Sequence, residues 1–426
     1  MRLRDWDRNL KIRLAGETIV NITFWMFFPF LAIYFTDSFG KTSAGILLIV
    51  SQAFSVMANL LGGYYADRFG RKKMMVLSAC IQGIAFVIFG LSSSPWLDSP
   101  ILGFICFTII GMFGAIYWPA SQAMVADVVP EKHRSSVFAI FYTSINIAVV
   151  IGPIIGGIFY KDYRFPLLIS AGILNIVLSI ILKIWIEETA PAYQHVGGTE
   201  KQNWLRAIGA QMKDYRVIVQ DRTFLLFIIA GVLVGQTFMQ LDLLFPVYVS
   251  ENISNQPLLS FGEWSLVIEN TQAFGLILAE NGLLVALFTI VVTRWMTKFK
   301  EKNVFILSSI IYAISIFLFS QTSWIWGMLF AMAIFTLAEL MTAGIQQGFI
   351  SEIAPEDKRG QYFAAASLRF TFSKMLAPLS IPMSAWFGYT WTFMIIFMFA
   401  LLSAVIYYIM FSKMDKNKHQ AVWAEE

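Results

Sequence analysis

The chain has 426 residues, of which 58% are hydrophobic and 14% are charged, and its formal net charge is +4. A soluble domain carries about 25% charged residues, so this composition excludes a soluble globular protein. Apolar runs of roughly 20 residues recur along the chain, which is the length that crosses a hydrocarbon core of about 30 Å as a helix. We therefore expect an all-α polytopic membrane protein.

The apolar runs predict twelve transmembrane helices arranged in two halves of six. The expected ranges are 14–36, 44–66, 74–92, 101–126, 136–160, 165–186, 224–249, 273–296, 303–320, 324–350, 361–386 and 390–412. The predicted divisions are an N-terminal half at 1–186, a cytoplasmic linker with an amphipathic helix at 187–222, a C-terminal half at 223–414 and a cytoplasmic tail at 415–426. Two halves joined by a long connection are typical of transporters that alternate access around a midplane site.

The lysines and arginines predict the orientation of these spans. If the N-terminus is cytoplasmic, 26 of the 31 basic residues fall in or beside the termini and the cytoplasmic loops. This bias follows the positive-inside rule, so we expect a multi-pass protein of the cytoplasmic (inner) cell membrane with both termini in the cytoplasm. The positive net charge then reflects orientation, and no nucleic-acid partner is expected.

The most charged short segment is GYYADRFGRKK at 63–73, between spans two and three. A segment with five charged residues among eleven cannot lie in the hydrocarbon core of a membrane, so it must be a tight turn in water. Its basic residues alone could simply fix topology. Asp67 adds nothing to the positive-inside bias, which favours a gating role for the cluster.

Acidic residues inside the predicted spans are the strongest candidates for chemistry. Glu17, Asp242, Glu280 and Glu339 lie in spans one, seven, eight and ten. A charge at the bilayer centre costs about 2.5–3.5 kcal/mol on the insertion scale, so each carboxylate needs a cavity or a partner. Competition between a proton and a cation for one carboxylate is the simplest antiport device. The alternative for Asp242 and Glu339 is a structural pair with one of the two cations of span eleven, Arg369 and Lys374.

Polar and aromatic side chains within the spans predict a broad lipophilic pocket. Aromatic rings bind planar cations, although most rings in so aromatic a chain must face lipid or core. The candidate pocket residues are Asn21, Trp25, Gln52, Trp118, Gln122, Tyr142, Asn146, Gln236 and Arg369.

Other functional classes lack their residues in this sequence. Both cysteines fall in apolar runs and the three histidines are scattered, so no metal site is expected. The sequence has no phosphate-binding glycine-rich loop of the GxxxxGK[ST] type and no nucleophile–base set, which argues against an enzyme and against any cofactor. Transport would then draw on an ion gradient, with protons as the expected energy source.

Two motifs resemble those of the major facilitator superfamily. The charged turn is similar to motif A, whose members here are Gly63, Asp67, Arg68, Gly70 and Arg71, and span five contains a segment similar to motif C, with Gly152, Pro153, Gly156 and Gly157. The resemblance implies the twelve-helix major facilitator fold. It also implies that Asp67 contacts the start of span eleven near Gln361, and that Arg71 reaches Asp127 at the end of span four. Motif C is interpreted either as close helix packing or as a hinge and seal.

The whole plan resembles the multidrug/proton antiporter branch of that superfamily, of the LmrP type. In that branch, carboxylates at the positions of Asp242 and Glu339 serve coupling and cation binding, and Glu17 is a third candidate. The expected function is proton-coupled efflux of lipophilic or cationic compounds by alternating access, with a role in antibiotic resistance. The alternative is a superfamily carrier for a specific solute such as a peptide, sugar or lipid, and a membrane enzyme or scaffold is a third class. The expected partners are a small substrate, protons and membrane lipids, and the chain is expected to be a monomer.

Overall fold

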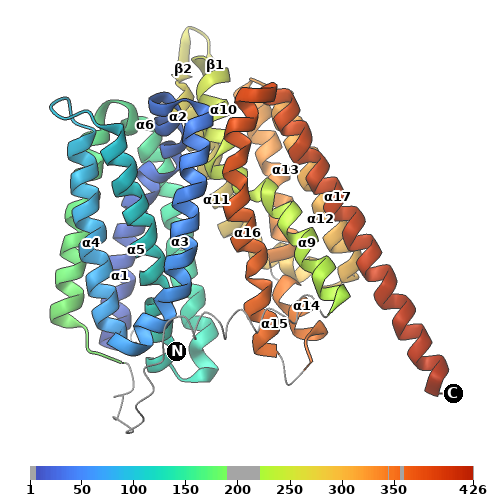
Figure 1. Cartoon of the computed structure of the whole chain (residues 1–426). Helices are drawn as coiled ribbons and strands as arrows, with labels where there is room; N and C mark the ends of the chain where they lie inside the picture. The colour runs from blue at the N-terminus through green and yellow to red at the C-terminus, as the bar shows by residue number, and fades with distance from the viewer. Residues whose placement is uncertain (1–5, 190–220, 344, 356–358, 426) are drawn as a thin grey trace. The chain divides into compact units, whose positions relative to one another are not determined.

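The computed structural model describes residues 6–189, 221–343, 345–355 and 359–425 of the chain (Figure 1). The predicted amphipathic helix of the linker lies outside the described residues. Almost every described residue is helical, and ten segments are long and apolar enough to cross a membrane. The described residues form two compact units: 6–40 with 47–189, and 41–46 with those from 221 onward. The exact bounds of the halves, linker and tail remain predictions.

The first unit is built from long helices in sequence order. Its elements are α1 (Arg8–Phe27), η2 (Phe28–Phe30), α2 (Leu31–Phe39), α3 (Lys41–Phe69, whose first six residues belong to the second unit), α4 (Arg71–Ser92), α5 (Pro100–Val128) and α6 (Glu131–Trp185). Helix α6 packs against both α1 and α4, and α4 also packs against α5 (Figure 1). Asp7 caps α1 by accepting the backbone N–H of Asn9 at 2.7 Å.

The second unit contains the remaining helices and a short hairpin. Its elements are α9 (Arg222–Phe238), η3 (Met239–Asp242), α10 (Leu244–Asn252), β1 (Gln256–Phe261), β2 (Trp264–Ile268), α11 (Asn270–Met296), α12 (Glu301–Ser320), α13 (Ile325–Ala343), α14 (Ile345–Ile353), α15 (Arg359–Ala366), α16 (Leu368–Leu376), η5 (Ala377–Leu379) and α17 (Ser380–Glu425). A buried aromatic cluster of Phe224, Phe227, Phe305, Phe349 and Tyr407 fills its core. These rings tie α9, α12, α14 and α17 together.

The ten apolar segments correspond to the twelve predicted spans. Residues 137–185 and 361–415 form segments of 49 and 55 residues, each about twice the length that a bilayer requires. Each contains one residue with non-helical backbone angles, Tyr163 in α6 and Gly388 in α17. Gly388 has φ of +77°, a conformation that glycine adopts without strain. Both positions coincide with predicted boundaries between spans, so counting each long segment as two spans gives the twelve-helix plan.

The loop predicted at 250–272 contains an antiparallel hairpin that the sequence analysis missed. Strands β1 and β2 join α10 to α11 and meet at a turn around Gly262 (Figure 1). The strand residues are too few and too exposed to show a clear alternation of apolar and polar positions. The hairpin is attached to the unit by Gln256, which bonds to the backbone of Ser323 and Ile325 at 2.9 Å each.

The glycines of motif C lie where α6 packs on α1. A Cβ added at Gly156 would meet the backbone carbonyl oxygen of Met26, and one at Gly152 would meet the backbone of Trp25. The residues at these two positions must therefore lack a side chain for the helices to pack at this separation. This close packing agrees with the first of the two interpretations of motif C.

We expect Gly156→Val to reduce the yield of folded protein sharply, because overpacking a helix contact costs about 1–3 kcal/mol or more. The measurement is the fraction of detergent-extracted protein that elutes as a single sharp peak in size-exclusion chromatography. Gly348→Ala is the matched control, since a Cβ there meets nothing within 4 Å. A Gly156→Val protein with the yield and melting temperature of the wild type would contradict the packing argument.

Candidate functional site

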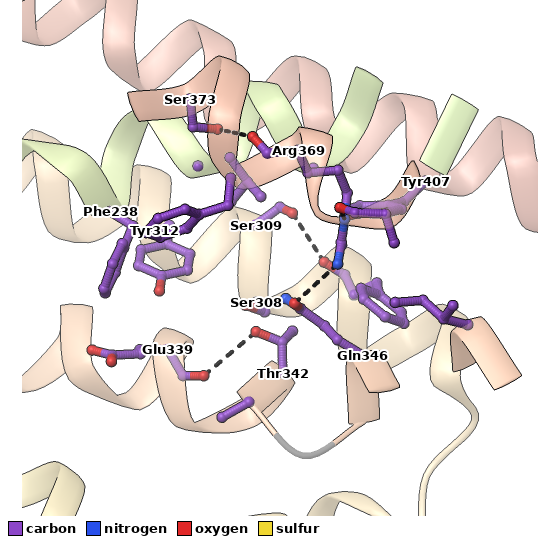
Figure 2. A pocket seen from close by; sticks show the side chains of 18 of the residues that line it. Phe238, Ser308, Ser309, Tyr312, Glu339, Thr342, Gln346, Arg369, Ser373 and Tyr407 are labelled. Carbon is purple, nitrogen blue, oxygen red and sulfur yellow. Dashed lines mark hydrogen bonds between the residues drawn. The ribbon is translucent and has the colours of Figure 1, made fainter. Parts of the chain in front are cut away.

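The second unit contains a cavity of about 420 Å³ with a carboxylate on its wall (Figure 2). Glu339 reaches it from α13, and Arg369 reaches it from α16. Polar side chains complete much of the lining: Ser308, Ser309, Tyr312, Thr342, Gln346, Ser373 and Tyr407. The cavity therefore combines one carboxyl group, one guanidinium group and several hydroxyl groups that can bind a cation or water.

Glu339 is held by a neutral partner. Its Oε2 accepts a hydrogen bond of 3.0 Å from Asn281 Nδ2, and the same amide group donates to Thr336 Oγ1 at 3.0 Å. Among the described residues, no ion pair within 4.0 Å involves Glu339. The described residues therefore contain no structural ion pair between Glu339 and Arg369, which was the alternative. A carboxylate without a fixed counter-cation can take up a proton or a mobile cation.

Arg369 makes its contacts on the other side of the cavity. Its guanidinium donates to Gln346 Oε1 at 3.5 Å (Figure 2) and to the carbonyl oxygen of Ala366 at 3.2 Å. It also lies 4.2 Å from the centre of the Phe227 ring. The cation is thus stabilised by carbonyl groups and an aromatic face. Of the remaining pocket candidates, Gln236 lies close by, since its Nε2 donates to the carbonyl of the lining residue Ser373 at 3.3 Å.

Asp242 lies in the same unit but outside the lining of this cavity. It is the last residue of η3, where span seven changes from α9 to α10. Its Oδ1 atom is buried and has no hydrogen-bond partner among the described residues. The predicted intramembrane carboxylate is therefore present at a break in its helix.

Glu17 belongs to a closed polar network in the first unit. Arg13 Nε contacts Glu17 Oε1 at 2.9 Å, and the same oxygen accepts from Tyr117 at 2.7 Å and Ser121 at 3.3 Å. Arg13 also donates to Ser121 and lies 5.1 Å from the centre of the Phe141 ring. Arg13 is only 1% exposed. The sequence analysis counted Arg13 only among the basic residues that predict topology. Its spacing of four residues from Glu17, which places both side chains on one face of a helix, could have indicated the ion pair.

The other pocket candidates lie in the first unit, on α1, α3, α5 and α6. Trp118 and Tyr142 are about half exposed, and Asn146 donates to the carbonyl oxygen of Tyr142 at 3.0 Å. Gln52 Oε1 is buried and has no hydrogen-bond partner in the part of the chain that the structure describes. Within the described ranges, Asn21, Trp25 and Gln122 make no polar contact that assigns them a role in binding.

The motif A turn contains the predicted contact to span four. Arg71 lies 3.1 Å from Asp127 Oδ2 and 2.8 Å from Asp67 Oδ1. Arg68 bonds locally to the Tyr64 hydroxyl at 2.9 Å. Gly70 has φ of +100°, which allows α3 to end and α4 to begin within one residue. The predicted contact of Asp67 with the start of span eleven stays a prediction.

Glu188 and Thr189 follow span six and complete this cluster. The sequence analysis did not select either of them. Glu188 Oε1 accepts the backbone N–H groups of Arg71 and Lys72 at 2.9 and 3.3 Å, at the N-terminus of α4. A carboxylate there is favoured by the free N–H groups and the helix dipole. Thr189 donates its hydroxyl to Asp127 Oδ2 at 3.1 Å. The beginning of the linker is thus bonded to motif A.

We expect Arg71→Gln to lower the transport rate by about 5–150-fold, the range of a typical coupling free energy of about 1–3 kcal/mol. The physical reason is that Asp127 and Asp67 would lose their shared cation. Initial transport rates in membrane vesicles, corrected for protein amount, provide the measurement. Lys73→Gln removes an equal charge from the same turn without breaking a described ion pair, and should transport nearly as the wild type does. Equal loss in both variants would show that charge alone matters.

Comparison with known proteins places this architecture in a family. The sequence profile described as Major Facilitator Superfamily matches residues 14–268 and 260–424. The chain belongs to the major facilitator superfamily. It is therefore a transporter and not an enzyme, as the sequence motifs predicted, and the twelve-helix fold prediction is confirmed.

Individual relatives within the superfamily have different described functions. The chain is 56% identical over 421 residues to a protein of Planococcus maritimus described as a Na(+), Li(+), K(+)/H(+) antiporter, covering 98% of this chain and 99% of that protein. It is 25% identical over 259 residues to the multidrug resistance protein MdtH of Salmonella choleraesuis (strain SC-B67), covering 60% of this chain and 59% of that protein. The structure is similar to a POT family transporter in complex with 5-aminolevulinic acid, with a TM-score of 0.76, 17% identity and coverage of 96% and 97%. This last similarity concerns the fold alone.

Proposed function

We propose that this protein is a proton-coupled antiporter that expels cations, and that monovalent metal cations are its first substrates. The observation that carries the proposal is the partly buried carboxylate of Glu339, which faces a cavity and, among the described residues, has an amide group and not a fixed cation as its partner. The negative charge of such a carboxylate is stabilised by a bound proton or by a bound cation, so the group can bind the two in alternation. The relative described as a Na(+), Li(+), K(+)/H(+) antiporter supports this substrate class.

Alternating access follows from the same competition. When the cavity is open to the cytoplasm, a cation replaces the proton on Glu339. When it opens to the other side, where protons are more abundant, a proton expels the cation. The coupling free energy between the two ligands is their mutual exclusion at one carboxylate, which is reciprocal by linkage. The motif A contacts of Arg71 with Asp67 and Asp127 serve as a latch in this cycle.

A second candidate function is efflux of lipophilic cations. The cavity is within the size range of about 300–1,000 Å³ that accepts drug-sized ligands. Phe238, Tyr312, Phe363 and Phe370 contribute aromatic rings to its wall. The multidrug resistance protein MdtH among the relatives supports this substrate class as well. Both functions use the same carboxylate, so they differ only in which cation the cavity accepts.

The proposed setting is the cytoplasmic membrane, with both termini in the cytoplasm, a proton gradient as the energy source and a monomer as the working unit. The test uses everted membrane vesicles energised to be acidic inside and loaded with acridine orange. Addition of NaCl, LiCl or KCl to vesicles containing the protein should restore dye fluorescence as protons leave, whereas choline chloride should not. Ethidium added under the same conditions tests the second candidate. No response to any of these cations would overturn the proposed function.

A further inference from the structure

Asn281 is a buried amide side chain on α11 that joins two residues of α13. It is 5% exposed, and its Nδ2 donates to Thr336 Oγ1 and to Glu339 Oε2 at 3.0 Å each. Thr336 and Glu339 lie three residues apart on α13, so their side chains share one face of that helix. A single amide group therefore connects the carboxylate of the cavity to a neighbouring hydroxyl group.

The hydroxyl group of Thr336 fixes the orientation of this amide. Thr336 is 1% exposed, and it donates its own proton to the carbonyl oxygen of Met332 at 2.9 Å. The Thr336 oxygen can therefore only accept a bond from Asn281, so the amide nitrogen must point toward it. That nitrogen carries two N–H groups, and the second one donates to Glu339. The reversed amide would place its oxygen against two acceptors.

The two oxygens of the Glu339 carboxyl group are therefore not equivalent. Oε2 faces an N–H group, which cannot accept a proton. Oε1 accepts no hydrogen bond from a described residue, and it is not sealed within the packing. Glu339 lies on the wall of the cavity (Figure 2). A proton or a cation that comes from the cavity therefore reaches Oε1.

The bond from Asn281 can persist in both states of Glu339. When Oε1 carries a proton, Oε2 is the carbonyl oxygen of the carboxyl group and still accepts the N–H. When the proton leaves and a monovalent cation contacts Oε1, the same bond joins the N–H to a charged carboxylate. A hydrogen bond to a charged group is roughly twice as strong as one between neutral groups. Asn281 therefore stabilises the cation-loaded state more than the proton-loaded state.

We propose that Asn281 is a positioning residue for the exchange at Glu339, because it holds Oε2 as a permanent acceptor and leaves Oε1 to the proton and the cation in turn. Thr336 acts through Asn281 by keeping the amide nitrogen directed at the carboxylate. Each exchange forms one contact between the cation and Oε1 and releases the one proton of Oε1 to water. This inference rests on the proposed function and deepens it, because it names the atom at which the two ligands exclude each other.

Two other charged residues lie near this contact in the cavity or in the chain. Arg369 lines the same cavity, but no ion pair within 4.0 Å joins it to Glu339 in the described part of the chain. Glu280 directly precedes Asn281, and its buried Oε2 has no hydrogen-bond partner among the described residues. A substitution at Asn281 also alters the surroundings of Glu280, so the test needs a second variant at Thr336 on the other helix.

The first experiment measures Na⁺-driven proton movement in proteoliposomes over a range of Na⁺ concentrations. Asn281→Leu loses the bond to the charged carboxylate, so its KM for Na⁺ should rise by about tenfold or more. Its Vmax at saturating Na⁺ should stay near that of the wild type. Thr336→Val keeps the shape of threonine without the hydroxyl, and its KM should rise by about three- to tenfold. Thr336→Ser restores the hydroxyl and should restore the wild-type KM.

Thr289→Val is the matched control on α11, since the Thr289 hydroxyl donates to the carbonyl of Val285 in its own helix. Its KM should equal that of the wild type. A wild-type KM in Asn281→Leu or in Thr336→Val would overturn the inference, and so would equal KM values for Thr336→Val and Thr336→Ser. A lower Vmax with an unchanged KM would make the contact structural only. Absence of any cation response in the wild type would instead overturn the proposed function.

Infrared difference spectra of the purified protein test which oxygen carries the proton. The wild type at acidic pH should show a carboxyl C=O band that disappears on addition of NaCl and is missing in Glu339→Gln. If the proton is on Oε1, this C=O group is the one bonded to Asn281, and the bond lowers its frequency. The band should therefore move to higher wavenumber in Asn281→Leu. A band that does not move would place the proton on Oε2 and refute the inference.

Discussion

Replacing Glu339 with glutamine should abolish cation-driven proton movement in everted vesicles while leaving the protein folded. Glutamine has nearly the shape of glutamate, and its side-chain oxygen can still accept the hydrogen bond from Asn281. What it lacks is a proton to exchange and a charge to attract a cation into the cavity. Recovery of acridine orange fluorescence after NaCl addition should therefore fall to the level of vesicles without the protein.

Two further variants make this result specific. Glu263→Gln makes the same chemical change on the exposed hairpin and should leave proton movement unchanged. Glu339→Asp keeps an ionisable group on a shorter side chain, so part of the activity should remain with a weaker apparent affinity for Na⁺. Wild-type exchange by Glu339→Gln would mean that the bond from Asn281 to Glu339 is structural only, and that another group carries the proton.

Replacing Arg13 with methionine should destabilise the protein strongly. Arg13 is 1% exposed and Glu17 accepts its hydrogen bond, so the variant leaves a mostly buried carboxylate, with a side chain 13% exposed, without its cation. Removing one member of a buried ion pair typically costs about 3–5 kcal/mol. The melting temperature of the purified protein in detergent, followed by intrinsic fluorescence, should fall accordingly.

The double variant Arg13→Met with Glu17→Gln tests the origin of that loss. Because it removes the charge that was left unpaired, it should regain much of the melting temperature of the wild type. Its transport activity then decides the role of Glu17. A stable double variant that still exchanges Na⁺ for protons would make the network structural, whereas a stable but inactive one would support Glu17 as a coupling group.

Much of the fold followed from the sequence because lipid imposes a simple requirement. Each span must be helical and about 20 residues long, so apolar runs and basic loops were sufficient to predict twelve helices. The interruptions of span seven at η3 and of span eleven at η5 were not predicted. Pro246 and Pro378 were visible in the sequence, but a proline inside a membrane helix can bend it, break it or leave it nearly straight. The outcome depends on which neighbours satisfy the released backbone groups.

The candidate site was predictable to a smaller degree. Intramembrane carboxylates such as Asp242 and Glu339 could be identified because a charge in the membrane is costly and rare. Their partners could not be identified in the same way, since neutral residues such as Asn281 and Tyr117 are common in spans and only the packing brings them close. Glu188 was missed for a related reason: an acid in a loop carries no signal until its position at a helix N-terminus is known.

The intramembrane carboxylates also differ in when each can be neutralised during synthesis of the chain. Arg13 and Glu17 lie one turn apart on α1, so they can neutralise each other as soon as that helix exists. The first span can thus enter the bilayer as an electrically balanced segment. Asp242 has no basic residue within four positions of it along the chain. The seventh span must therefore insert with its acid protonated, or wait in the translocon until later helices cover it.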